Sequence, residues 1–122
     1  MKFKFKTDGL VDEWRELLVI NPDLVFMVMT YTSQIGTPVT ITEIFRTEAM
    51  QRRYYRNSSV RSVHQEWRGV DVSVRGVGLS LVEHYCDALN ELFPYDETRS
   101  NLKSFLLHDT GMGMHLHIQN MV

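Results

Sequence analysis

Two groups of polar residues, far apart in the chain, constrain its fold more than any other feature. His64 and Asp71 form the first group, and His115 and His117 form the second. Imidazole and carboxylate groups are common zinc ligands, and catalytic zinc ions are usually held by three such side chains with water in the fourth position. We therefore take His64, Asp71 and His117 as a candidate zinc site, with His115 beside it.

The spacing of His64 and Asp71 excludes one continuous helix over this stretch. Seven residues of helix would separate the two side chains by about 10 Å along the axis. Ligand atoms that each lie about 2 Å from one metal ion are within about 4 Å of each other. The chain must turn between the two residues, and we predict the turn at Gly69, because glycine tolerates backbone angles that other residues avoid.

Alternating apolar and polar residues predict that the later ligands lie on β-strands. The stretch 70–74 (Val-Asp-Val-Ser-Val) alternates and is rich in β-branched residues, so Asp71 and Ser73 should share one face of a strand. His115 and His117 fall in a second predicted strand, where residues two apart point to the same face. One of these histidines can bind the metal while the other stands close enough to move a proton.

These residues resemble a known signature. Ser62-x-His64-x6-Asp71 followed by His115-x-His117 is similar to the metal-binding signature of the hedgehog/DD-peptidase superfamily. Its members include zinc D,D- and L,D-peptidases of the bacterial cell wall, such as D-Ala-D-Ala carboxypeptidases, and short bacteriophage endolysins. The upstream stretch 44–51 (Ile-Phe-Arg-Thr-x3-Gln) resembles the strand-ending aromatic-Arg-Thr-x3-Gln segment of the family. The resemblance covers roughly residues 38–119.

The resemblance implies a role for each of these residues. It implies that Zn²⁺ is bound by His64, Asp71 and His117, and that Arg46 binds a carbonyl or carboxylate group of the substrate. An arginine fork suits both a carboxylate and a developing oxyanion. We expect Ser62 to form a hydrogen bond with the substrate backbone.

The chain departs from the family pattern at three positions, and one of them bears on the catalytic base. The family usually has Gly at the position of Trp67 and Ala at the position of Gly69. Its carboxypeptidase branch has a Glu three residues before the last zinc ligand, where this chain has Met114. We therefore expect the general base to be His115, with Asp109 as the next candidate.

The rest of the chain predicts an α+β fold, with a small, mainly antiparallel sheet and helices packed on it, and the resemblance implies a hedgehog/DD-peptidase-like arrangement. The length predicts a single domain over residues 1–122, and the resemblance implies that this domain is zinc peptidase-like. Helices are predicted over about 8–20, 22–35, 47–55 and 80–93, with Asn21, Thr47 and Ser80 as N-caps. Strands are predicted over 2–6, 39–46, 70–74, 103–107 and 114–120, with a loop over 56–61 that delivers His64.

Two other side chains are of interest, and the first has two possible roles. His108 is expected either to be a residue of the final hairpin or to orient a zinc ligand, since ligating imidazoles usually donate their other N–H to an oxygen. Cys86 is the only cysteine, so it cannot form an internal disulfide, and its apolar helical surroundings predict a buried thiol.

Composition and charge limit the other classes of function. A formal net charge of −2 gives no overall case for nucleic-acid binding. Residues 46–75 are nevertheless rich in arginine, with Tyr54, Tyr55 and Trp67 nearby for stacking. These arginines are Arg46, Arg52, Arg53, Arg56, Arg61, Arg68 and Arg75. A binder of acidic polymers is therefore one alternative function.

The expected function is hydrolysis of stem or cross-bridge peptides of peptidoglycan by a zinc-dependent, endolysin-like peptidase. A non-catalytic zinc-binding module of the same fold is the other alternative. No signal peptide or membrane span is predicted, because the most apolar run, 24–29, is far shorter than the ~20 residues of a span. We expect the chain to be made in the cytoplasm and to act on the cell wall if it is released or carried by a phage. The sequence leaves the oligomeric state open.

Overall fold

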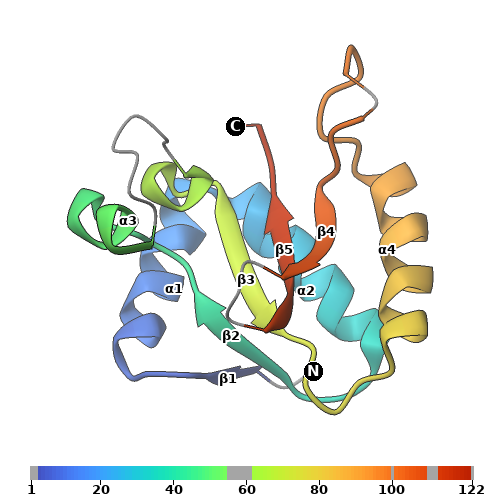
Figure 1. Cartoon of the computed structure of the whole chain (residues 1–122), viewed down its shortest axis with the longest axis horizontal. Coiled ribbons are helices and arrows are strands. Elements are labelled where there is room, and N and C mark those ends of the chain that lie inside the picture. The colour runs from blue at the N-terminus through green and yellow to red at the C-terminus, as the bar shows by residue number, and fades with distance from the viewer. Residues whose placement is uncertain (1–2, 55–61, 100, 110–112, 122) are drawn as a thin grey trace.

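Five strands form one mixed sheet, and helices pack against it, as the computed structural model shows (Figure 1). The structure describes residues 3–54, 62–99, 101–109 and 113–121. The strands are β1 (Phe3–Phe5), β2 (Val39–Glu43), β3 (Gly69–Ser73), β4 (Phe105–Asp109) and β5 (Met114–Gln119). The helices are α1 (Gly9–Ile20), α2 (Pro22–Ile35), α3 (Glu48–Tyr54), the 3-10 helix η1 (Val63–Glu66) and α4 (Leu79–Leu92). The α+β class is confirmed.

The strand order is β1-β2-β3-β5-β4, so β5 lies between β3 and β4. The β2–β3, β3–β5 and β5–β4 pairs are antiparallel, as expected for a mainly antiparallel sheet. Only β1 and β2 run parallel among the described strands, and α1 and α2 connect them. The predicted loop over 56–61 and turn residues 110–112 lie outside the described residues.

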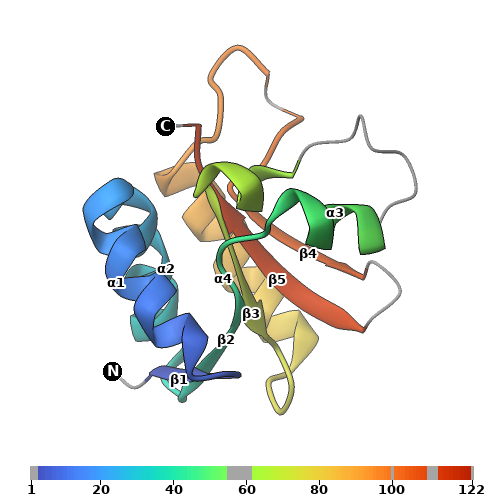
Figure 2. The ribbon, with the colours of Figure 1, turned by 90° about the vertical axis from the view of Figure 1, so that its left-hand side faces the viewer.

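Helices α1, α2 and α4 cover one face of the sheet, while α3 and η1 lie on its other side (Figure 2). Strand alternation decides which side chains meet the helices. Val70 and Val72 of β3 and Leu116 and Ile118 of β5 are fully buried in the core with the helices. The polar residues between them therefore point to the opposite face.

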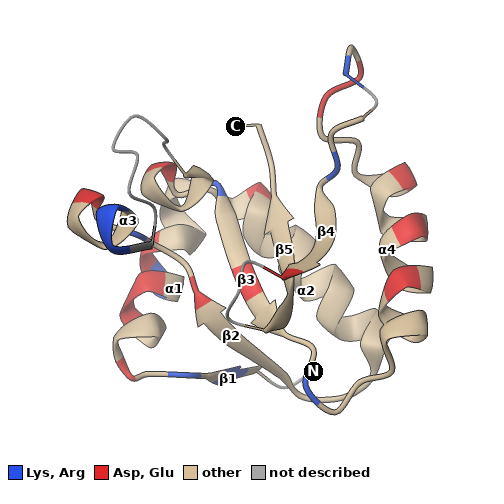
Figure 3. Cartoon of the chain, viewed as in Figure 1, with Lys and Arg blue, Asp and Glu red and all other residues tan. Residues whose placement is uncertain are grey.

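Helix α4 has two distinct sides, which explains how it packs on the sheet. Val82, Cys86 and Leu89 are buried, so the prediction of a buried thiol is confirmed. Acidic residues recur along α4 (red in Figure 3), and its exposed acidic side chains are Glu83, Asp87 and Glu91. No helix in the described part of the chain is long and apolar enough to cross a membrane.

The helix starts follow the predicted caps in two cases out of three. Asn21 accepts a hydrogen bond from the backbone N–H of Leu24 at the start of α2, and Thr47 accepts one from the N–H of Met50 at the start of α3. The prediction of Ser80 as an N-cap is wrong, because α4 begins at Leu79. Gly76, with a φ of 81°, lies in the turn between the end of β3 at Ser73 and the start of α4.

Two strands differ from their predicted bounds by more than one residue. β2 ends at Glu43 rather than at residue 46, and β4 covers 105–109 rather than 103–107. Just before β4, the hydroxyl of Ser104 donates to the carbonyl oxygen of Phe93, and its own carbonyl oxygen accepts from the N–H of Gln119. The shift of β4 places His108 within a strand rather than in the hairpin connection.

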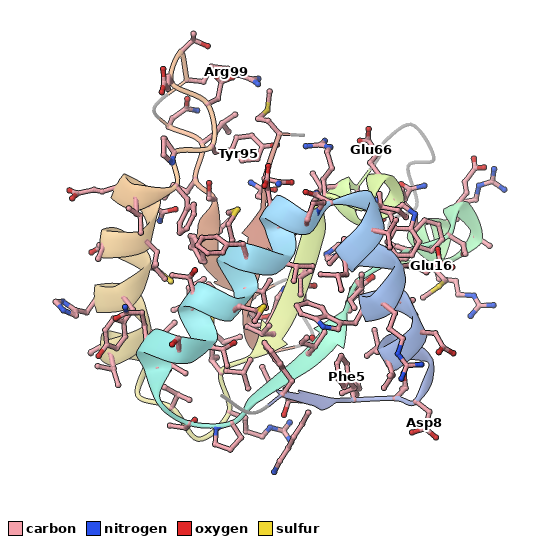
Figure 4. All side chains as sticks on the ribbon, turned by 180° about the vertical axis from the view of Figure 1, so that it is seen from behind. Phe5, Asp8, Glu16, Glu66, Tyr95 and Arg99 are labelled. Atoms are coloured by element: carbon pink, nitrogen blue, oxygen red, sulfur yellow. The ribbon has the colours of Figure 1, made fainter. Side chains whose placement is uncertain are left out.

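Hydrogen bonds of a buried side-chain amide help to hold the N-terminal helices against the strands. Asn21 Nδ2 donates to the carbonyl oxygen of Trp67 at 3.0 Å and to Asn120 Oδ1 at 2.8 Å. Asn120 Nδ2 donates back to Asn21 Oδ1 at 3.0 Å. Figure 4, from behind, shows the helical layer that this amide fixes in front of the strands. Asn21 therefore connects the start of α2 to Trp67, just before β3, and to Asn120, just after β5.

We expect Asn21→Ala to lower the free energy of unfolding by about 3 kcal/mol, because it removes a helix cap and leaves buried partners without hydrogen bonds. Asn21→Ser keeps a capping oxygen and should lose less. The matched control is Asn101→Ala at an exposed asparagine. Urea denaturation measures all three, and equal losses in Asn21→Ala and Asn101→Ala would contradict the role of this amide.

Candidate metal centre

The two polar groups of the sequence meet at the middle of the sheet, on the face away from α1, α2 and α4. Asp71 on β3 is the cross-strand partner of His117 on β5, and Ser73 is the partner of His115. His64 comes from η1, just before β3. Metal-binding atoms of His64, Asp71 and His117 all lie within 4.8 Å of one another, so these residues could hold a metal ion.

A capping box fixes the short helix that carries His64. Ser62 Oγ accepts from the backbone N–H of His64 at 3.2 Å, and Gln65 Oε1 accepts from the backbone N–H of Ser62 at 3.0 Å. Each of these bonds satisfies a backbone donor at the start of η1. The hydroxyl of Ser62, predicted to bind substrate, therefore also positions a candidate ligand.

The turn predicted at Gly69 lies at Trp67 instead. Trp67 ends η1 with a φ of 57°, in the left-handed region that favours glycine. Its ring stacks on Phe45 with centroids 4.7 Å apart and planes 20° from parallel, a contact that offsets the backbone strain. Trp67 does not line the cleft described below, so it packs beside the site rather than narrowing it.

Gly69 is required for space rather than for its backbone angles. It is the first residue of β3, and a Cβ there would lie 2.6 Å from Val63 Cγ2 and 3.0 Å from His117 Cε1. Any larger side chain would push against the ring of His117. The absence of a side chain at Gly69 thus lets η1 and β5 approach each other.

The carboxylate of Asp71 lies between the two candidate imidazole ligands. His117 Nδ1 is 2.7 Å from Asp71 Oδ1, and His64 Nε2 is 3.3 Å from Asp71 Oδ2. The rings of His64 and His117 are nearly perpendicular, at 76°, with centroids 5.1 Å apart. Two nitrogen atoms and a carboxylate group therefore face a common point.

In each of the two imidazoles, one nitrogen atom, the inner one, faces Asp71, and the other, the outer one, contacts an oxygen acceptor. His64 Nδ1 is 3.0 Å from each of two main-chain carbonyl oxygens, and His117 Nε2 is 3.0 Å from Gln119 Oε1. The Gln119 amide is oriented by its own Nε2, which donates to the carbonyl oxygen of Lys103. Each imidazole can therefore donate its outer N–H and direct the lone pair of its inner nitrogen at a metal, as zinc-binding histidines do.

Burial and pairing shift the pKa values of the site in opposite directions. Burial acts to raise the pKa of Asp71, but hydrogen bonds and charge from His117 and His64 outweigh it and hold that pKa far below its usual range. Burial acts to lower the pKa of His64, but the hydrogen bond to Asp71 and its negative charge raise it overall. In the metal-free protein, the negative charge of Asp71 therefore favours the protonated form of His64.

The cluster lines a cleft of about 1330 Å³ that also contains the predicted substrate-binding residues Arg46 and Ser62. The guanidinium of Arg46 donates to both oxygens of Glu43, at 2.6 and 2.8 Å, and to Gln51 Oε1 at 2.7 Å. This explains the Arg-Thr-x3-Gln segment, because Thr47 caps α3 and α3 then presents Gln51 to Arg46. Arg46 is therefore held firmly in the wall of the cleft.

The two predicted bases occupy different places. His115 Nε2 is 3.6 Å from Asp71 Oδ2, and the His115 ring lines the cleft. Asp109 is exposed at the end of β4, where it accepts from the N–H of Gly113, and it does not line the cleft. The structure thus brings His115, but not Asp109, to the candidate metal centre.

The sequence interpretation missed Glu43 as a residue of the cleft. Alternation places Glu43 on the same face as Ile41, which is fully buried in the core. The register between β2 and β3 shifts between these two residues, so that Ile41 pairs with Val72 and Glu43 with Asp71. This irregularity turns Glu43 to the cleft. No pattern in the sequence signals it.

His108, predicted either to lie in the final hairpin or to orient a zinc ligand, lies on β4. It is the cross-strand partner of His115, and the centroids of the two rings are 4.5 Å apart. Burial, together with the charges of His115 and His117, lowers the pKa of His108. If β4 had been predicted to cover residues 105–109, its pairing with β5 would have placed His108 opposite His115.

Comparisons with known proteins give no relative for this chain. No protein-family model matches it, and neither a curated protein nor a solved structure matches it. The function is therefore argued from the geometry of the cluster and from the chemistry of its residues.

We expect Gly69→Ala to weaken zinc binding at least tenfold and to lower the free energy of unfolding by about 1–3 kcal/mol, because the added methyl group displaces His117 and Val63. Gly9→Ala is the matched control, since a Cβ at Gly9 meets nothing within 4 Å. Zinc titration calorimetry and urea denaturation measure the two effects. Unchanged zinc affinity in Gly69→Ala would contradict the tight approach.

The pKa shifts predict how stability depends on pH without metal. Stabilisation from His64, whose pKa is raised above 6.5, is complete below about pH 6.5 and is lost as the pH rises through the raised value. Stabilisation from Asp71, whose pKa is lowered from 3.8, is complete above about pH 4 and is lost only in stronger acid. The lowered pKa of His108 acts in the opposite direction, so the His64 contribution is measured as the melting temperature of the wild type minus that of His64→Gln. Without metal, this difference should be smaller at about pH 8 than at about pH 5.

Zinc should reverse this trend, because it binds only the neutral imidazole and stabilises more as the pH rises. Thermal denaturation with a chelator and with zinc, at both pH values, measures the reversal. A metal-free difference between the wild type and His64→Gln that grows from pH 5 to pH 8 would contradict the assignment.

Proposed function

We propose that this chain is a zinc-dependent peptidase of the hedgehog/DD-peptidase type, which hydrolyses stem or cross-bridge peptide bonds of peptidoglycan. The observation that carries the proposal is the cluster of two imidazoles and one carboxylate whose imidazoles have oxygen acceptors at their outer nitrogen atoms. The order of these residues in the sequence and the upstream Arg-Thr-x3-Gln segment support the family.

The ligand set favours zinc over the common alkaline-earth ions. Calcium and magnesium prefer oxygen ligands, whereas two imidazoles and one carboxylate are typical of catalytic zinc. His64, Asp71 and His117 are only 2%, 6% and 7% exposed, so bulk water competes poorly for the ion. Three protein ligands leave the remaining position for water or substrate.

A zinc ion in this site would supply Lewis acidity to the scissile carbonyl group and to a water molecule. His115 lies beside Asp71 and would accept a proton from the water and pass it to the leaving amine. The positive charge of Arg46 in the cleft wall would stabilise negative charge on the carbonyl oxygen or on a peptide carboxylate. Ser62 Oγ accepts from His64, and its hydroxyl hydrogen would donate to the substrate backbone.

Binding of acidic polymers through the arginine-rich segment has less support. Several arginines in this segment already pair with acidic neighbours: Arg46 with Glu43, Arg52 with Glu48, and Arg68 with Glu66. Such pairs reduce the positive field that a polyanion would need. The predicted contributions of Arg56, Arg61 and Tyr55 lie outside the described residues, as does the side chain of Tyr54.

The proposal is tested with protein purified without a metal-chelating resin and incubated with purified peptidoglycan. We expect one tightly bound zinc per chain and release of peptide amino groups that stops on addition of a chelator and resumes with zinc. His117→Ala should lose the zinc and the hydrolysis. His115→Gln should keep the zinc but lower kcat at least a hundredfold, because the proton acceptor is lost.

His84→Ala is the matched control, since His84 is an exposed imidazole on α4 on the opposite side of the sheet. It should retain zinc and activity. Hydrolysis that resists both the chelator and His117→Ala would contradict the proposal. Bound zinc without turnover on any peptidoglycan substrate would instead identify a non-catalytic zinc-binding module.

A further inference from the structure

The Asp71 carboxylate faces a second pair of imidazoles as well as the first. His108 on β4 and His115 on β5 are direct cross-strand partners. Metal-binding atoms of Asp71, His108 and His115 all lie within 4.8 Å of one another. This second triad shares only Asp71 with the first one. Four histidines therefore lie around one carboxylate.

The two histidines of the second triad have features of metal ligands. His115 Nδ1 is 3.3 Å from the carbonyl oxygen of Gly113, so its N–H can donate there and leave the lone pair of Nε2, 3.6 Å from Asp71 Oδ2, free for a cation. His108 Nε2 is buried and has no hydrogen-bond partner among the described residues. Leaving a buried nitrogen unsatisfied costs free energy, and a cation bound to it would remove this cost.

We propose that Asp71, His108 and His115 form a second site for a divalent transition metal ion such as zinc, adjacent to the first site and sharing the Asp71 carboxylate with it. The class of ion follows from the ligands, because imidazole nitrogen with one carboxylate suits zinc, copper and nickel better than calcium or magnesium. A carboxylate has two oxygen atoms and can contact two cations at once.

The second site is the weaker of the two. His108 and His115 are partly exposed, whereas His64 and His117 are buried. One carboxylate compensates the charge of two dications poorly, so the first ion repels the second. The first site should therefore fill completely before the second begins to fill.

Filling of the second site changes what His115 can do. A metal ion on His115 Nε2 occupies the lone pair that would otherwise accept a proton. Zinc in excess should therefore inhibit the peptidase, an expectation that rests on the proposed function, whereas the binding of the second ion does not.

Zinc titration of the full chain tests the site directly, with bound metal measured by equilibrium dialysis and elemental analysis. The wild type should bind two zinc ions, the second at least tenfold more weakly than the first. His108→Gln should bind one, with the affinity of the first site unchanged within about twofold. His84→Gln, the matched control, should bind two. Circular dichroism checks that each variant is folded.

Electron paramagnetic resonance with copper(II) gives a second readout that needs no turnover. Two equivalents of copper in the wild type should give the broadened spectrum of two coupled ions, and His108→Gln should give the spectrum of an isolated ion. A wild type that binds one ion at every concentration, or a His108→Gln variant that still binds two, would overturn the proposal.

The failures of the two proposals can be told apart. A chain that binds two zinc ions but hydrolyses no peptidoglycan retains the second site and loses the proposed function. A chain that hydrolyses peptidoglycan with one zinc, and that excess zinc does not inhibit, retains the function and loses the second site.

Discussion

The ionised carboxylate of Asp71, buried in the middle of the sheet, sets the condition that the surrounding structure meets. Removing a carboxylate from water costs several kcal/mol unless it is paired and hydrogen-bonded. His117 meets this need from the neighbouring strand, and His64 meets it from η1. The capping box holds η1 in place, and the bare Cα of Gly69 lets it approach β5. Much of the local chain conformation therefore serves to surround one charge.

The features that sequence reasoning predicted correctly depend on local chemistry. The alternation of 70–74 placed Asp71 and Ser73 on one strand face, and the cross-strand pairs with His117 and His115 agree with it. The N-cap at Asn21 follows from a side-chain oxygen that reaches the backbone of the next turn. Such features involve neighbours in the sequence, so a single chain carries enough information to predict them. The family resemblance and the roles of the site residues stay predictions.

The features that it missed depend on contacts between distant segments. Tryptophan rarely adopts a positive φ, so the sequence gives no reason to expect one at Trp67. The stack of Trp67 on Phe45, which accounts for this backbone angle, joins two segments that are distant in the sequence. Glu43 reaches the cleft because the register between β2 and β3 shifts, which requires both strands. The position of His108 beside His115 depends on the register between β4 and β5, which requires both strands.

The direct register between β3 and β5 limits how this chain can change in evolution. Side chains alternate along a strand, so inserting or deleting one residue within β3 would turn Asp71 towards the helices and bring a valine to the cleft. A change of one residue in β5 would do the same to His115 and His117 together. Substitutions can therefore accumulate around the centre one at a time, whereas a change in strand length removes all its ligands on that strand at once. The lengths of these two strands should be preserved as strictly as the ligands that they carry.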